Sequence, residues 1–123
     1  MSTQAASTQQ VANRLVELGR KGQIAEIQQE LFSDDVVSTE PSGDNPVAKG
    51  LVAIQEKSKK FESMLEAVHG SELTDPIVVG HWFSIGWTFD ATMKGQGRQK
   101  MEEICVYQVK DGKIVSEQFF FSM

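Results

Sequence analysis

Three glutamates, Glu40, Glu103 and Glu117, offer carboxyl groups that could move protons. Proton transfer at carbon needs a base in an apolar cavity and an acid or hydrogen-bond donor that stabilises the enolate. Glu40 ends a short β-branched run and directly precedes Pro41, whereas the other two alternate with apolar residues near the C-terminus. Burial would raise the pKa of such a carboxyl group toward neutrality. The alternative is a solvated carboxylate, in a loop for Glu40 and at an open rim for Glu103 and Glu117.

The sequence offers few other reactive side chains. Cys105 is the single cysteine, so an intrachain disulfide is excluded, and the thiol is either a small buried apolar group or a pocket residue. His81 begins a predicted strand. His69 lies at the predicted end of a helix, where its charge would interact favourably with the helix dipole. Two histidines in these positions do not make a metal site. We expect neither a metal nor an organic cofactor.

Aromatic residues occur in the segments that would surround such carboxyl groups. If the fold encloses a cavity, they would line it and bind a small hydrophobic molecule; otherwise they fill a core. These residues are Phe61, Trp87, Phe89, Tyr107 and Phe119.

Length and composition favour one ordinary globular domain over residues 1–123, with residues 1–7 flexible. The chain has 123 residues, of which 40% are hydrophobic and 24% charged, and its net charge is -5. It has no basic stripe for nucleic acid. Its N-terminus lacks the apolar region of a signal peptide, and no apolar run approaches the ~20 residues of a membrane span. We therefore expect a cytoplasmic protein with no nucleic-acid or membrane partner.

The first half of the chain predicts three helices. A capping box at Ser7 and Gln10 opens the first helix, and a second, short helix follows with Ile24, Ile27 and Leu31 on one face. Apolar residues then step by three and four from Leu51 to Val68, which predicts a third helix ended by Gly70. The basic residues at 57, 59 and 60 read as its solvated face. A short strand at 36–39 and a loop at 41–49 separate the second and third helices.

The second half predicts a meander of antiparallel strands over residues 72–79, 81–93, 99–109 and 113–122. The long strand at 81–93 alternates cleanly and places Phe83, Ile85, Trp87 and Phe89 on one face. Asp111-Gly112 is a two-residue turn signal. Helices followed by a meander predict an α+β domain in which the helices cover one face of a curved sheet.

Three motifs in this order resemble the nuclear-transport-factor-2-like superfamily, in particular its SnoaL-like polyketide cyclases and ketosteroid isomerases. They are LFSDDV at 31–36, KGLVAI at 49–54 and DGKIV at 111–115. The resemblance covers roughly residues 8–122. It implies a cystatin-like cone in which three N-terminal helices and a curved antiparallel sheet enclose a pocket. One fold hosts many reactions, so the resemblance does not identify a reaction.

The resemblance also implies roles for individual residues. Glu40 lies where the isomerases have an aspartate base, and Cys105 lies where they have a protonated acid. A thiol is a poor hydrogen-bond donor, and Leu15 stands in place of the isomerases' first-helix tyrosine, so steroid isomerisation is disfavoured. Two strands would point the following residues into the pocket: Met101, Glu103, Cys105, Tyr107 and Val109, and Val115, Glu117, Phe119 and Phe121.

The opposite face of the sheet carries Trp82, Ile104, Val106, Ile114 and Phe120. A solvated face should be polar, so this apolar face predicts a partner, and we expect a homodimer. Three functions remain open. The leading interpretation is a pocket protein that binds a small hydrophobic or carbonyl-bearing molecule and, if it is a cofactor-free isomerase, cyclase or hydrolase, uses Glu40 or Glu117 to transfer the proton. The alternatives are a non-catalytic ligand-binding domain and an interaction module.

Overall fold

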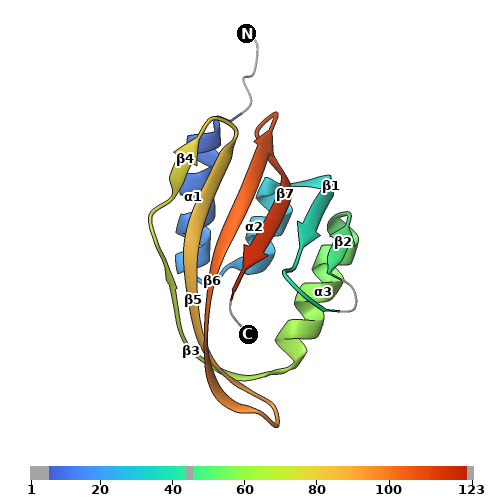
Figure 1. Cartoon of the computed structure of the whole chain (residues 1–123), viewed down its shortest axis with the longest axis vertical. Coiled ribbons are helices and arrows are strands. Elements are labelled where there is room, and N and C mark those ends of the chain that lie inside the picture. Colours follow the sequence, from blue (N-terminus) through green and yellow to red (C-terminus); the bar gives the residue numbers. More distant parts are fainter. Residues whose placement is uncertain (1–5, 44–45, 122–123) are drawn as a thin grey trace.

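The computed structural model describes residues 6–43 and 46–121 as an α+β fold (Figure 1). These residues form three helices: α1 (Thr8–Arg20), α2 (Ile24–Leu31) and α3 (Leu51–Ser63). The strands are β1 (Phe32–Thr39), β2 (Val47–Lys49), β3 (Leu65–Leu73), β4 (Ile77–Val79), β5 (Trp82–Met93), β6 (Gly97–Lys110) and β7 (Lys113–Phe120). Most of the predicted flexible segment 1–7 lies outside the described residues. Within it, Ser7 forms the expected capping box with Gln10 and begins α1.

The seven strands form one mixed sheet in the order β2-β1-β7-β6-β5-β3, with β4 also paired to β5. The prediction of a purely antiparallel sheet is wrong, because β1 pairs in parallel with β7. In addition, the predicted loop at 41–49 contains β2, which pairs with β1. This parallel contact joins the first strand of the chain to the last.

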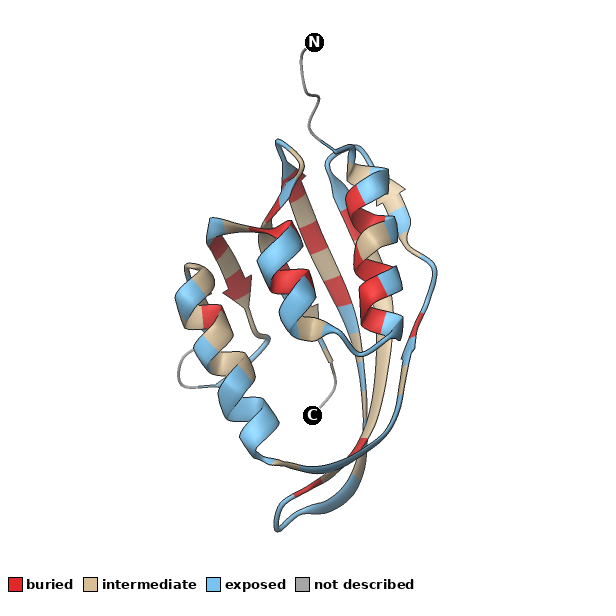
Figure 2. Cartoon of the chain, turned by 180° about the vertical axis from the view of Figure 1, so that it is seen from behind, coloured by how far each residue is buried: buried red, intermediate tan, exposed pale blue. Residues whose placement is uncertain are grey.

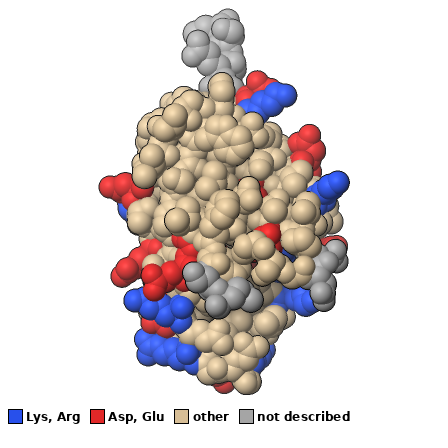
Figure 3. Space-filling model, in the orientation of Figure 1, with Lys and Arg blue, Asp and Glu red and all other residues tan. Residues whose placement is uncertain are grey.

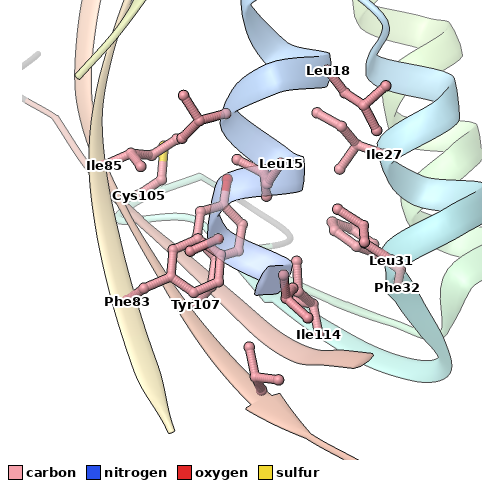
Figure 4. Packing of buried hydrophobic residues seen from close by; sticks show 14 of the residues in the cluster. Leu15, Leu18, Ile27, Leu31, Phe32, Phe83, Ile85, Cys105, Tyr107 and Ile114 are labelled. Atoms are coloured by element: carbon pink, nitrogen blue, oxygen red, sulfur yellow. The ribbon is translucent and has the colours of Figure 1, made fainter. Parts of the chain in front are cut away.

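The helices lie on one face of the sheet, and their buried sides point toward it (Figure 2). Val11, Leu15 and Leu18 of α1 are buried, as are Ile27 and Leu31 of α2, which confirms the predicted apolar stripes. Figure 4 shows Leu15 pointing toward Cys105 and Tyr107 of the sheet. The core therefore lies between α1, α2 and the central strands.

The third helix is shorter than predicted. It ends at Ser63, and Leu65–Leu73 form β3, which pairs with β5. Gly70 and His69 therefore both lie within a strand rather than at a helix end. The predicted strand at 72–79 is likewise two strands, β3 and β4, separated around Pro76, which cannot donate a ladder hydrogen bond. Leu65 and Val68 continue the helical spacing of α3 in the sequence. Their structure is nevertheless that of a strand, because they pair with β5.

A β-bulge changes which residues of β7 face inward. The register between β6 and β7 shifts between Gln108 and Val109, and Val109 pairs with Ile114. Ile114 is therefore fully buried, and the predictions that Ile114 faces outward and Val115 inward are wrong. Beyond the bulge Glu117 is buried and Phe119 half-buried, as the alternation predicts.

The sheet face away from the helices is poor in charged side chains, which gather mainly toward its rim (Figure 3). Trp82, Ile104 and Phe120 are about half exposed on this face. A groove of about 710 Å³ is lined by residues of this face, including Thr88, Ile104 and Phe120, and also by Trp87 and Glu103, which alternate with them along β5 and β6. Among the described residues, no helix is long and apolar enough to cross a membrane.

Candidate functional site

The structure brings the three predicted glutamates together on the helix-facing side of the sheet. Glu117 lies on β7 and is buried, whereas Glu103 on β6 and Glu40 at the end of β1 are half-buried. Their charges influence one another, because both Glu40 and Glu103 raise the pKa of Glu117. Glu103 is paired with Trp87 and Glu117 with Tyr107. Because paired residues share one face of the sheet, both glutamates point to the side that carries Trp87 and Tyr107.

Glu117 has the chemistry expected of an acid–base group. Its exposed fraction is 6%. Burial raises its pKa from 4.5 to about 7, although a hydrogen bond from the Ser38 hydroxyl and the charge of Lys57 both oppose the rise. Ser38 pairs with Glu117 across the parallel β1–β7 contact and is fully buried. A carboxyl group with this pKa can both accept and donate a proton at neutral pH.

Lys57 of α3 reaches into this cluster. Its Nζ donates to Glu40 Oε1 at 2.9 Å and to Ser38 Oγ at 3.0 Å. It also lies 5.6 Å from the ring centroid of Phe119, within the range of a cation–π contact. The reading of Lys57 as part of a solvated helix face is therefore wrong. Lys57 and Ile54 lie on the side of α3 that packs toward β1, whereas Lys59 and Lys60 are exposed.

Glu103 and Cys105 form a second polar contact on β6. The Cys105 Sγ donates to Glu103 Oε1 at 3.6 Å. Burial raises the pKa of Glu103, and the charge of Glu40 adds to the rise. Burial also raises the pKa of the fully buried Cys105 thiol, with a further contribution from Glu103. Cys105 therefore remains a thiol at neutral pH and is not a nucleophile.

The predicted aromatic residues divide into a buried and a partly exposed group. Tyr107 is 2% exposed and stacks on Phe83, with ring centroids 4.8 Å apart, so both belong to the core (Figure 4). Trp87, Phe89 and Phe119 are half-buried on the same face. Phe61 of α3 is 39% exposed and lies 6.0 Å from the ring of Phe89. The partly exposed group therefore comes from α3, β5 and β7.

The histidines take no part in this cluster. His81 is exposed before β5, and His69 on β3 shares a hydrogen bond with Thr92 across the sheet. The expected interaction of His69 with a helix dipole is wrong, because the residue lies within β3. Within residues 6–43 and 46–121, no group of three His, Cys, Asp or Glu side chains is arranged to hold a metal ion.

Ser38 and Lys57 are the site residues that the sequence analysis missed. Ser38 stands at an inward position of the β-branched run 36–39, which could have marked it. Lys57 lies three residues after Ile54, on the apolar stripe of the helix, and that spacing was the available signal.

Comparisons with known proteins agree with this fold. The sequence matches the SnoaL-like domain family over residues 6–121. A crystal structure of a candidate SnoaL-like polyketide cyclase from Mesorhizobium loti is 33% identical, with a TM-score of 0.89, and the match covers 94% of this chain and 100% of that one. No curated protein matches the sequence.

Two more distant structures show the same fold. A protein of unknown function with a cystatin-like fold from Xanthomonas campestris is 19% identical, with a TM-score of 0.81 and coverage of 96% of this chain and 92% of that one. A ketosteroid isomerase-like protein from Catenulispora acidiphila, solved with trimethylamine, is 17% identical, with a TM-score of 0.74 and coverage of 95% and 88%. These two structures support the predicted cystatin-like α+β fold, and the family match over residues 6–121 shows that the chain belongs to the SnoaL-like domain family.

Proposed function

We propose that this SnoaL-like domain binds a small hydrophobic, carbonyl-bearing molecule and moves a proton on it, without a cofactor, through Glu117. The observation that carries the proposal is a buried carboxyl group with a pKa of about 7 on an apolar face. The Glu117 carboxylate would take a proton from the carbon next to the ligand's carbonyl. It would then return that proton to another atom of the resulting enolate.

Glu117 is a better candidate for this role than Glu40. Glu40 is held in an ion pair with Lys57, with N and O atoms 2.9 Å apart, and its side chain is 28% exposed. The Glu40 oxygen that accepts from Lys57 is therefore already occupied, whereas no lysine donates directly to Glu117 among the described hydrogen bonds. Glu103, half-buried beside Trp87, would contact the ligand rather than transfer the proton.

The ligand would approach past the partly exposed aromatic residues Phe61, Phe89, Trp87 and Phe119. Aromatic faces of this kind suit a flat, largely apolar molecule. The Mesorhizobium loti relative is described as a candidate polyketide cyclase, which supports polyketide-like aromatics as the first compounds to test.

A thermal-shift screen of polyketide-like aromatics, steroids, terpenoid epoxides and fatty acids tests the binding part of this proposal. A ligand at 100 times its dissociation constant adds about 2.7 kcal/mol of stability, which raises the melting temperature of a small domain by several degrees. Failure of all four classes to raise it would count against a ligand site.

Glu117→Gln tests the catalytic part. We expect this variant to bind a ligand found in the screen but to lose proton exchange at the carbon next to its carbonyl, followed as deuterium uptake by NMR. Glu102→Gln is the matched control, because Glu102 is an exposed glutamate on the neighbouring strand β6. Binding without exchange in the unaltered protein would favour a non-catalytic ligand-binding domain.

We also propose that the chain forms a homodimer through the sheet face away from the helices. Trp82, Ile104 and Phe120 expose apolar surface there, and charged side chains lie mainly toward the rim (Figure 3). Because each chain carries a net charge of -5, two copies meet with least repulsion where that charge is sparse. A second copy of the chain therefore suits this face.

A further inference from the structure

The Lys57 side chain has more partners in the site than a surface lysine needs. Its ammonium group has three N–H donors. One donates to Glu40 Oε1 at 2.9 Å and one to Ser38 Oγ at 3.0 Å. The centroid of the Phe119 ring lies 5.6 Å from Nζ, so the ring makes a cation–π contact with the ammonium group. The ammonium group is thus held by residues of β1 and β7, although Lys57 itself belongs to α3.

The contact with Ser38 bears directly on Glu117. Because the Ser38 oxygen accepts a hydrogen bond from Lys57, its own proton is free to point elsewhere. The Glu117 carboxyl group lies opposite Ser38 in the β1–β7 register, and the Ser38 hydroxyl lowers the pKa of Glu117. Ser38 is fully buried, so water does not compete for its hydroxyl group. Ser38 therefore lies between Lys57, which donates to its hydroxyl oxygen, and Glu117, its partner in the β1–β7 register.

The geometry points to Lys57 as a positioning residue of this site, one that holds the Ser38 hydroxyl against Glu117 and the Glu40 carboxylate at the end of β1. The inference rests on the proposed function for its catalytic meaning. The inference also makes a claim that needs no ligand: Lys57 of α3 affects the protonation of the buried Glu117 on β7. This claim can be tested on the unliganded protein.

Several charged or titratable groups face Glu117 from the elements packed around it. They are Lys57 from α3, Glu40 from the end of β1, and Glu103, Cys105 and Tyr107 from β6. Lys57 is the positive charge among them, and it favours the ionised form of Glu117. The negative charges of Glu40 and Glu103 instead disfavour the ionised form of Glu117. Removal of Lys57 therefore leaves the repulsion among the three carboxylates without a compensating positive charge.

Carboxyl carbon NMR of the unliganded, full-length chain tests the inference. In Lys57→Met we expect the pKa of Glu117 to rise by about one unit, the lower end of the effect of a close opposite charge. Lys59→Met removes the same charge from an exposed position of the same helix and should leave the pKa of Glu117 unchanged. Equal values in the unaltered protein and in both variants would overturn the inference.

Ser38→Ala separates the hydrogen-bond path from the charge of Lys57. If Lys57 acts partly through Ser38, then Ser38→Ala also raises the pKa of Glu117. The double variant then raises it by less than the sum of the two single changes. A fully additive pair of shifts would overturn the role of Ser38 as the link. Lys57→Gln, which keeps a donor without the charge, replaces Lys57→Met if that variant does not fold.

These outcomes are separable from failure of the proposed function. A rise of the Glu117 pKa in Lys57→Met, in a protein that neither binds nor exchanges any ligand, would uphold the inference and refute the proposed function. If a substrate is found, Lys57→Met should move the pH profile of kcat to higher pH, and Lys57→Arg should restore most of it. A purely structural role would lower the melting temperature without moving that profile.

Discussion

At the scale of single residues, burial of Glu117 links the stability of the protein to pH. Its pKa is about 7 in the folded chain, against an ordinary value of 4.5, so the folded state binds this proton more tightly than the unfolded state. The stabilisation is complete below the ordinary pKa and is lost as the pH rises through 7. Glu103 acts in the same direction, because burial raises its pKa too.

We therefore expect the free energy of unfolding to fall between pH 4.5 and pH 8, by on the order of 3 kcal/mol from Glu117. Urea unfolding at a series of pH values measures this change. Glu117→Gln should remove most of the slope and be more stable than the unaltered chain at pH 8, whereas Glu102→Gln should keep the slope. A flat profile in the unaltered protein would contradict the raised pKa.

Cys105 gives a second expectation at this scale. The thiol is fully buried and its pKa is raised, so both access and ionisation are suppressed. We expect a thiol reagent at pH 8 to modify the folded protein at least 100-fold more slowly than the urea-unfolded chain. Comparable rates in the two states would show that the strands around Cys105 open readily.

The sequence predicted the carboxyl groups of the site better than their partners. Alternation along β6 and β7 places Glu103 and Glu117 inward, and this placement depends only on the two-residue period of a strand. Contacts of Lys57 with Ser38 and Glu40 depend instead on where α3 crosses β1 in space. No local pattern encodes that crossing, and charged residues on a helix are solvated in most proteins.

At the scale of elements, the capping box of α1 contributes measurably to the free energy of unfolding. The Ser7 hydroxyl accepts from the Gln10 backbone at 3.1 Å, and the Gln10 side chain accepts from the Ser7 backbone at 2.9 Å. Ser7→Ala should lower the free energy of unfolding by about 1 kcal/mol, measured by urea unfolding. Ser42→Ala, in the exposed loop after β1, should change it by less than about 0.5 kcal/mol. Equal effects of the two substitutions would argue against the cap.

Elements with strong local signals were predicted well, and those determined by distant partners were not. The first helix carries its own start signal in the capping box, and Asp111-Gly112 forms its turn with positive φ angles of 53° and 76°. By contrast, Leu65 and Val68 continue a helical spacing, yet they pair with Met93 and Ala91 of β5. Tertiary pairing overrides local periodicity in such segments.

At the scale of the whole molecule, the apolar sheet face predicts the assembly state. We expect light scattering after gel filtration to give twice the chain mass of 13.6 kDa. Ile104→Lys should shift the protein to a single chain, because it places a charge in the centre of an apolar interface. Val52→Lys on the outer side of α3, where Val52 is 68% exposed, is the matched control. A monomer in the unaltered protein would refute the dimer.

The parallel pairing of β1 with β7 has a consequence for biosynthesis. On the ribosome, β1 emerges early but cannot gain its β7 neighbour until the last strand of the described chain has been made. During that interval the β1 edge opposite β2 remains open to competing strands. Non-local pairing of this kind also slows folding. Ser38 and Glu117 meet only through this pairing, so the candidate site cannot form until β7 has been synthesised, and a nascent chain that stalls before β7 lacks Glu117.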